Sequence, residues 1–143
     1  MNAAEPSAEL LGTVELRIPS KPEWVAVARL AVAAVANRLP YSVEEIEDLK
    51  LAMAEACTIC IQHGAGSETI DIRCDTMTTY LRIEVRDHRY RLRAAGSEGA
   101  KGRPSPAGEG LGIFLIQALM DELEYDIDPE AGTALVMIKR VGT

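Results

Sequence analysis

The sequence has little cysteine, no excess of positive charge and no long apolar run, and each shortage excludes a class of protein. Its three cysteines, Cys57, Cys60 and Cys74, are an odd number, which fits reduced thiols better than a disulfide framework. No apolar run reaches the ~20 residues of a membrane-spanning helix, and residues 1–11 lack the basic and apolar regions of a signal peptide. We therefore expect a cytoplasmic protein.

Acidic residues outnumber basic ones by 22 to 15, which gives a net charge of −7 at pH 7 and an isoelectric point near 4.9. No stretch clusters Lys and Arg without compensating acids, which argues against a nucleic-acid backbone as the partner. Other proteins, or a small anion bound with a metal, are the expected ligands. With 143 residues, of which 48% are hydrophobic, the chain has the size of one domain with its own core.

Periodicity predicts a strand and then a helix near the N-terminus. We expect residues 1–12 to be flexible, whereas the alternation of apolar and polar residues over 13–18 is typical of a half-buried strand. Ser20 can cap a helix that has Pro22 in its first turn and ends near residues 39–40. The expected apolar face of this helix comprises Trp24, Val27, Ala28, Ala31 and Val35.

A second helix and a hairpin follow. The capping box Ser-Val-Glu-Glu at 42–45, together with apolar residues at spacings of three and four, predicts a helix over about 42–63. The sequence Gly-Ala-Gly at 64–66 ends it. Two β-rich runs, 69–75 and 79–86, predict a hairpin.

The last third of the chain combines a long polar segment with apolar elements. Residues 87–107 are rich in Arg, Gly, Ser and Pro and are predicted to form a lid loop. The apolar residues 113–123 predict a buried helix, and 124–127 and 133–141 predict a terminal strand pair. Because helices and hairpins interleave, we expect residues 13–141 to form one α/β two-layer sandwich, with a mixed, mainly antiparallel sheet covered on one face by three helices.

Three glycines at alternate positions, Gly108, Gly110 and Gly112, directly precede the apolar helix. Glycine lets a ligand approach the backbone closely, and the free N–H groups at a helix start favour an anion such as phosphate. A flexible turn is an equally good interpretation of an isolated glycine cluster. No Gly-Lys-Ser/Thr follows and no strand leads directly into the loop, so neither a Walker loop nor a dinucleotide-binding fingerprint is present.

Glu55 is the candidate proton acceptor on the second helix. It shares a helix face with Asp48, Ala52 and Ile59, and a solvated face would not carry an isoleucine. If this face lines a cleft, the carboxylate can accept a proton from a water or a hydroxyl group. From the spacing alone, an ordinary exposed helix acid is the favoured alternative.

The order of these motifs resembles a known family. Residues 42–63, with Glu-Glu-Ile-Glu-Asp-Leu-Lys followed by Ala-Glu-Ala-Cys-Thr, look like the first conserved box of the RsbW and SpoIIAB anti-sigma kinases, which are GHKL (Bergerat-fold) ATPases. The loop at 108–112 resembles their second glycine box, and Gly132-Thr133 resembles the Gly-Thr that opens their last strand. The similarity spans about 13–141 in the family order, so it is more specific than any single motif.

The resemblance implies a histidine-kinase-like ATPase fold and a role for each motif. Glu55 would be the general base that activates a substrate serine. Asp87 would hydrogen-bond the adenine amino group, and Thr133 would support the adenine, since a carboxylate acceptor discriminates an exocyclic amine. The phosphates of ATP or ADP would be held by Gly108, Gly110, Leu111 and Gly112.

Two positions depart from the family pattern. Four residues after Glu55 the family carries an Asn that binds Mg²⁺, whereas Ile59 offers no oxygen here. The family's Asp-x-Gly reads Asp87-His88-Arg89, with a bulky charged residue where a glycine lets the backbone pass beside the purine. We therefore expect both the coordination of Mg²⁺ and the packing of adenine to be weakened.

Cys57, Cys60 and His63 allow a different interpretation, a redox or metal site, because they lie at helical spacing. No second C-x-x-C pair is present and the cysteines fall on the apolar face, so structural burial is favoured. His63 and His88 could each act as a base, but neither has a paired carboxylate within sequence reach.

The function implied by the resemblance is that of an anti-sigma factor in a partner-switching system. Such a protein would be a homodimer that regulates transcription in a stress response. It would bind an RNA polymerase sigma factor or, alternatively, an anti-anti-sigma protein, whose serine it would phosphorylate with ATP. The main alternative is a catalytically inactive pseudokinase that keeps the fold and the partner surface but binds Mg·ATP weakly or not at all.

Overall fold

The computed structural model describes residues 8–63, 68–89, 110–128 and 130–142. These residues form five strands, three α-helices and one 3-10 turn. In chain order the elements are β1 (Leu10–Pro19), η1 (Pro22–Trp24), α1 (Val25–Ala36), α2 (Val43–His63), β2 (Thr69–Met77), β3 (Tyr80–Asp87), α3 (Gly110–Leu119), β4 (Glu122–Asp128) and β5 (Gly132–Arg140).

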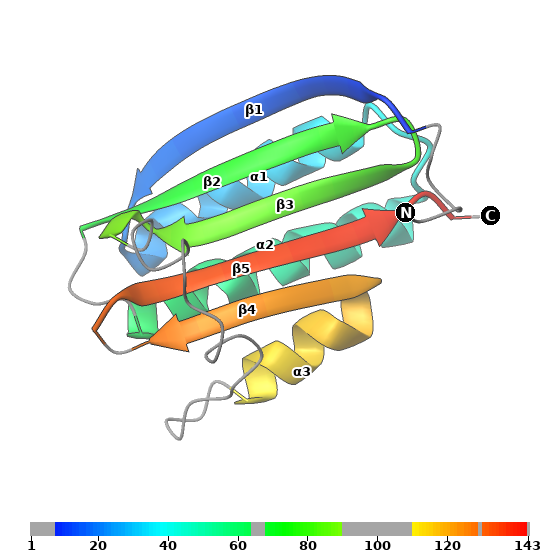
Figure 1. The fold of residues 1–143 in the computed structure, drawn as a ribbon. Coiled ribbons are helices and arrows are strands. Elements are labelled where there is room, and N and C mark those ends of the chain that lie inside the picture. The colour runs from blue at the N-terminus through cyan, green and yellow to red at the C-terminus, as the bar shows by residue number, and fades with distance from the viewer. Residues whose placement is uncertain (1–7, 64–67, 90–109, 129, 143) are drawn as a thin grey trace.

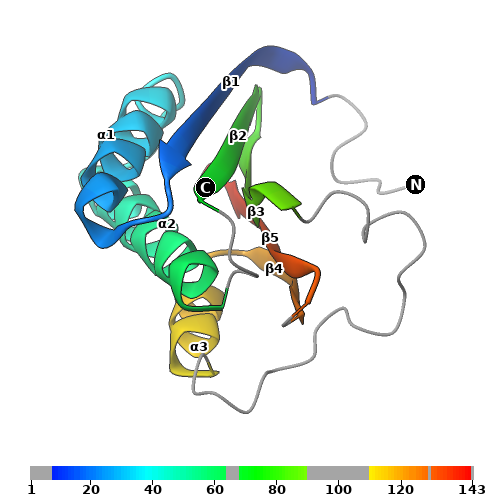
Figure 2. The same cartoon turned by 90° about the vertical axis from the view of Figure 1, so that its left-hand side faces the viewer.

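The five strands form one sheet, and the three helices cover one of its faces (Figure 1, Figure 2). The expected α/β two-layer sandwich is therefore confirmed. The strand order is β1-β2-β3-β5-β4, and every pairing among the described strands is antiparallel, so the sheet has none of the parallel pairs of a mixed sheet. After β1 the chain passes through α1 and α2 and returns as β2, which pairs antiparallel with β1. β5 lies between β3 and β4 and is antiparallel to both.

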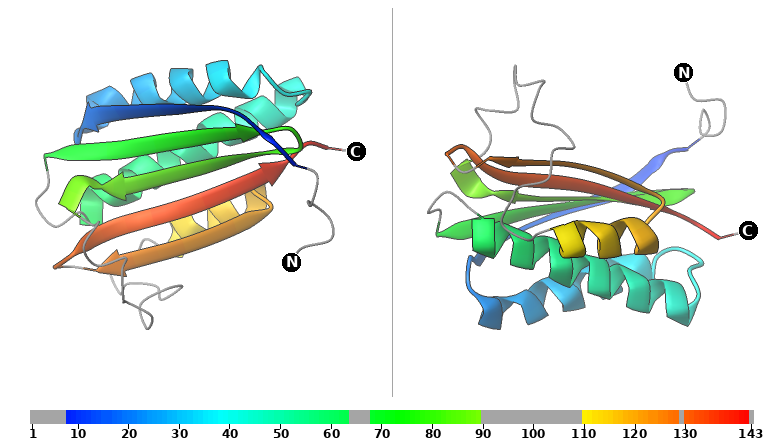
Figure 3. Two further views of the ribbon diagram at one scale, coloured as in Figure 1. Left: turned by 45° about the horizontal axis from the view of Figure 1, so that its top comes forward. Right: turned by 90° about the horizontal axis from the view of Figure 1, so that it is seen from below.

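The central helix of the layer is α2, which packs between α1 and α3 (Figure 3). Its predicted capping box is present: the Glu45 N–H donates to Ser42 Oγ at 3.0 Å, and the Ser42 N–H donates to Glu45 Oε1 at 2.7 Å. Since α2 contacts the sheet and a helix on each side, much of its circumference is apolar. Its buried residues are Leu49, Ala52, Met53, Ala56, Cys57, Ile59 and Cys60.

The strand at the N-terminus is longer than the sequence pattern predicts. β1 begins at Leu10 rather than at Thr13, because Leu10 pairs with Met77 and Gly12 with Thr76 across a bulge. Residues 10–12 thus belong to the sheet and not to a flexible N-terminus.

The first helix differs in its start and in the face that it buries. Residues 22–24 form a 3-10 turn whose N-cap is Lys21 and which has no side-chain cap, so the expected cap by Ser20 is not formed. α1 ends at Ala36. Its buried residues are Ala28, Val32, Val35 and Ala36, whereas Trp24 and Val27 are exposed. The helix is apolar nearly all round, so its periodicity alone does not select a face.

The third helix is shorter than predicted. It ends at Leu119 rather than at residue 123. At this end, Lys139 Nζ donates a hydrogen bond of 2.7 Å to the Leu119 carbonyl oxygen. β4 then begins at Glu122. At the other end, residues 110–112 form the first turn of the helix instead of a loop before it.

The apolar sequence of α3 also led to the wrong expectation about its burial. Within α3 only Ile113 and Ile116 are buried, while Leu111 and Phe114 are 78% and 67% exposed. The reason is its place at the margin of the helical layer, where α2 covers it on one side (Figure 3). None of the described helices is both long enough and apolar enough to cross a membrane.

The candidate site residues lie at one end of the sheet. β3 and α2 end there, and β5 and α3 begin there, at the left of Figure 1. The expected lid, 87–107, lies outside the described residues except for its first three, and Gly108 also lies outside them.

Candidate functional site

The start of α3 packs directly against α2 at Glu55 and Ile59. A Cβ atom added to Gly112 would lie 3.3 Å from Glu55 Oε1 and 3.3 Å from Ile59 Cδ1, closer than Cβ atoms usually approach a neighbour. Glycine therefore permits the close contact of the two helices. Glu55 is half-buried at this junction. The structure thus brings Glu55, Ile59 and Gly112 together.

Ile59 occupies the position at which the family pattern carries a metal ligand. Its side chain is 2% exposed and lies against Gly112. An alkyl group has no electron pair to donate, and Mg²⁺ takes oxygen ligands. Within the described part of the chain, no group of three or more His, Cys, Asp or Glu side chains could hold a metal ion. The residues present do not fit a Mg²⁺ site on α2.

Asp87 is a buried acid at the end of β3, with 1% of its surface exposed. The Arg89 backbone N–H donates to Asp87 Oδ1 at 3.0 Å. On the other side, a Cβ atom added to Gly132 would lie 3.0 Å from Asp87 Oδ2. Gly132 also has a φ of +109°, a conformation that side chains rarely adopt. Glycine is therefore required where β5 starts against the Asp87 carboxylate.

Thr133 joins β5 to the end of α2. It is fully buried, and its Oγ1 donates a hydrogen bond of 3.3 Å to the His63 carbonyl oxygen. One helical turn earlier, Cys60 lies beside Asp87, whose backbone hydrogen-bonds to the thiol. Asp87, Thr133 and the last turn of α2 consequently form one packed unit, although they come from three distant parts of the sequence.

The two cysteines of α2 face the core and are at most 1% exposed. Burial raises the pKa of Cys57 to about 12 and raises that of Cys60 well above its ordinary value. A thiol reacts and binds metal as the thiolate, so burial disfavours the reactive form of both groups at neutral pH. Their geometry favours structural burial over a redox or metal site.

The first turn of α3 presents backbone N–H groups that have no partner within the helix. Gly110 and Leu111 are exposed there, and a Cβ atom added to Gly110 would meet nothing within 4 Å. The turn is therefore accessible to an anion, which the helix dipole would favour.

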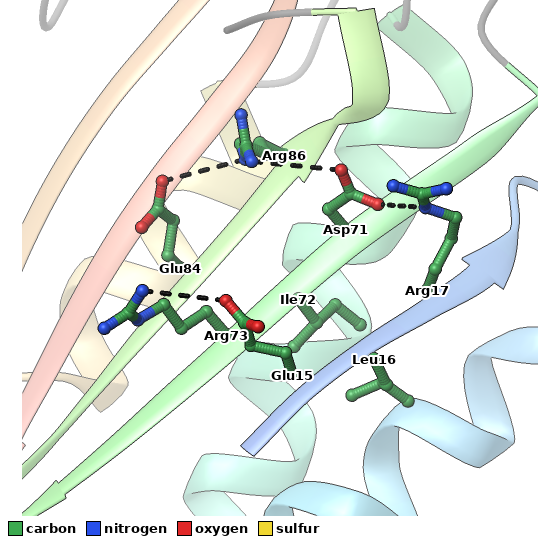
Figure 4. A pocket seen from close by; sticks show the side chains of 8 residues that line it. All are labelled: Glu15, Leu16, Arg17, Asp71, Ile72, Arg73, Glu84 and Arg86. Carbon is green, nitrogen blue, oxygen red and sulfur yellow. Dashed lines mark hydrogen bonds and ion pairs between the residues drawn. The ribbon is translucent and has the colours of Figure 1, made fainter. Parts of the chain in front are cut away.

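Two hollows on the surface lie away from these residues. One, of about 590 Å³, lies on the open face of the sheet over β1, β2 and β3 (Figure 4). The other, of about 570 Å³, lies between β1 and α1. Neither is lined by Glu55 or Asp87.

The charged side chains of the open face belong to none of the predicted motifs. Their signal is charge at every second position of three neighbouring strands, which places these side chains on one side of the sheet. The arginines in the hollow are already paired: Arg17 Nε lies 2.7 Å from Asp71 Oδ1, and Arg73 Nη1 lies 3.6 Å from Glu15 Oε2. Such a balanced array offers no excess positive charge to an anion.

Comparison with known proteins agrees with this fold. Residues 18–139 match the histidine kinase-like ATPase domain. Three similar proteins are serine-protein kinases RsbW. That of Bacillus pumilus is 34% identical over 143 residues, covering 92% of this chain and 87% of the relative. That of Halalkalibacterium halodurans is 35% identical over 135 residues, covering 89% of this chain and 82% of the relative. That of Bacillus licheniformis is 32% identical over 137 residues, covering 88% of this chain and 84% of the relative. The chain therefore belongs to the RsbW family of the histidine kinase-like ATPases.

Proposed function

We propose that this chain is an anti-sigma factor of a partner-switching system that binds ADP or ATP at the α2–β3–β5 end of its sheet. The observation that carries the proposal is the buried Asp87 carboxylate, which lies against Gly132 and beside Thr133 where β5 begins. Glu55 and Gly112 lie together at the nearby start of α3. These residues lie in the motifs by which the sequence resembles the anti-sigma kinases, and the relatives are named serine-protein kinases.

In this proposal each group has a chemical task. Asp87 accepts a hydrogen bond from the exocyclic amine of adenine, because a carboxylate is an acceptor only. Thr133 supports the base, and the first turn of α3, with Gly110, Leu111 and Gly112, donates N–H groups to phosphate oxygens. Glu55 is the general base for a substrate serine. The proposed partners are a sigma factor and an anti-anti-sigma protein, and the proposed state is a cytoplasmic homodimer.

Calorimetry with ADP tests the nucleotide site. We expect the wild type to bind ADP with an affinity that hardly changes when Mg²⁺ is removed, because Ile59 provides no ligand. Asp87→Asn should weaken binding about tenfold, since a donor would replace an acceptor that faces an amine. Asp75→Asn on the open face is the matched control and should bind like the wild type, because Asp75 contacts Arg73 and Thr13 and not the site. Equal affinity of Asp87→Asn and the wild type would show that adenine does not bind there.

A specific observation favours a second candidate, a binding module without phosphotransfer. Ile59 is buried beside Glu55, so the proposed base has no metal ligand one turn away on its own helix. Phosphoryl transfer depends on positioning and on neutralising the charge of the transferring group. We expect transfer from labelled ATP to the cognate anti-anti-sigma protein to be slow or absent in the wild type.

Substitutions in α2 and at residue 89 distinguish the two candidates. Ile59→Asn, alone or with Arg89→Gly, should raise the rate of transfer, and adding Glu55→Gln should abolish the gain. Ile59→Val is the control for altered packing and should leave the rate unchanged. Brisk transfer by the wild type would contradict the second candidate and show that another group replaces the missing ligand.

A further inference from the structure

We propose that His88 is a positioning residue, which orients the Asp87 carboxylate for adenine by tying the turn after β3 to Asp71 on β2. The inference rests on the proposed function, because it concerns the base-binding carboxylate. It gives a role to His88, the unspecified middle position of the Asp-x-Gly pattern.

Asp71 is the centre of a charged cluster on the open face of the sheet. His88 Nδ1 lies 2.8 Å from Asp71 Oδ2, and Arg17 Nε of β1 lies 2.7 Å from Asp71 Oδ1. Arg86 of β3 approaches Asp71 Oδ2 at 3.9 Å, so that Asp71 lies between Arg86 and Arg17 (Figure 4). The His88 contact therefore connects the turn to an acid that is itself held by two strands.

The Asp71 side chain is 17% exposed, which distinguishes it from a surface acid. Its partial burial opposes ionisation, but the hydrogen bonds from His88 and Arg17 outweigh this effect and lower its pKa. At neutral pH His88 thus faces a carboxylate, and hydrogen bonds to ionised groups are the stronger ones.

The backbone pairing of β2 and β3 stops immediately before His88. Its last partners are Ile70 and Asp87. Beyond this point the His88 side chain continues the attachment to β2, on the face of the sheet opposite the buried Asp87 side chain. The side chains of two consecutive residues thus fix the strand end from both faces.

The turn that His88 holds supplies a hydrogen bond to the Asp87 carboxylate. The Arg89 N–H donates to Asp87 Oδ1 at 3.0 Å, which leaves Oδ2 on the side of Gly132. If His88 is released, the Arg89 N–H loses its alignment and the carboxylate can rotate. The family pattern has glycine at position 89, whereas the exposed Arg89 side chain must be kept clear of the base here. Anchoring the preceding residue achieves this.

Base selectivity separates positioning from a general loss of stability. IDP differs from ADP in carrying a carbonyl oxygen where adenine has its amine, so a correctly oriented carboxylate favours ADP. A variant that only loosens the fold lowers both affinities together. A variant that misorients Asp87 lowers the ratio of ADP affinity to IDP affinity.

The experiment measures both affinities by calorimetry for the wild type, His88→Ala, Asp71→Ala, the double variant, His88→Gln and Arg73→Gln. We expect His88→Ala and Asp71→Ala each to lower the ratio about fivefold, the effect of one misaligned hydrogen bond. The double variant should lose no more than either single one, because the two residues act through one contact. His88→Gln, which keeps a donor, should recover part of the ratio. Arg73→Gln removes an ion pair of the same face without touching Asp71 and should retain the wild-type ratio.

Hydrogen exchange adds a readout without nucleotide: the Arg89 amide should exchange faster in His88→Ala than in Arg73→Gln. The inference is overturned if His88→Ala keeps the wild-type ratio, or if it lowers both affinities equally. In that case the proposed function still stands where Asp87→Asn weakens ADP binding. A wild type that binds neither nucleotide would overturn the proposed function and this inference with it.

Discussion

At the scale of single residues, Gly132 is the position where backbone conformation and close packing both demand glycine. Among the described residues it alone combines a positive φ with three Asp87 atoms 3.0 Å from an added Cβ. We expect Gly132→Ala to lower the free energy of unfolding by about 1–3 kcal/mol and to weaken ADP binding, because it strains the backbone and displaces Asp87. Urea denaturation and calorimetry measure the two effects.

Gly12→Ala provides the control for this substitution. Gly12 lies in β1, and a Cβ atom added there would meet nothing within 4 Å. The free energy of unfolding should change by less than about 0.5 kcal/mol. Similar losses at both glycines would contradict the argument from local geometry.

The residues of the site were predictable to different degrees. Glu55, Asp87, Gly112 and Thr133 lie in motifs with a fixed order, so resemblance to the family was enough to propose them as site residues. The contact of His88 with Asp71 was not predictable, because it joins residues 17 positions apart and depends on the register of two strands. A charged residue in a β-rich run gives no sign of its cross-strand neighbour until that register is known.

At the scale of elements, the start of α2 allows a matched test of helix capping. Ser42 and Glu45 exchange two hydrogen bonds, whereas the turn after Ser20 has no side-chain cap. We expect Ser42→Ala to lower the free energy of unfolding by about 1 kcal/mol and Ser20→Ala to leave it nearly unchanged. Urea denaturation of both variants checks this, and a larger loss for Ser20→Ala would show that the capping box contributes little.

The presence or absence of start and stop signals in the sequence explains which elements were predicted well. Residues 42–63 begin with a capping box, have apolar residues at helical spacing and are followed by Gly-Ala-Gly, and α2 has nearly these bounds. Residues 113–123 contain no glycine or proline, and Asp121 and Glu122 fit a helix as well as a strand, so the pattern could not show that the helix ends at Leu119 and a strand follows. How much of α3 is buried depends on its position beside α2, and the sequence of the helix alone does not give this position.

At the scale of the whole molecule, the net charge of −7 bears on the proposed partners. An acidic anti-sigma factor should associate with the basic DNA-recognition region of a sigma factor, and faster at low salt than at high salt. We expect the tagged protein to recover a sigma factor from a lysate of its own organism without added ATP, as identified by mass spectrometry. The reconstituted pair should then show the salt dependence. Recovery of neither a sigma factor nor an anti-anti-sigma protein would contradict the proposed function.

The two ends of the described chain meet at the end of the sheet farthest from the site. The Thr78 N–H donates to the Glu9 carbonyl and the Val141 N–H to the Thr79 carbonyl, each at 2.8–2.9 Å, so both ends flank the turn between β2 and β3. Asp87 and Gly132 lie at the opposite end of their strands (Figure 1). Attached to a sensor surface through a group placed at residue 9 or 142, the protein would present the proposed nucleotide site to the solution.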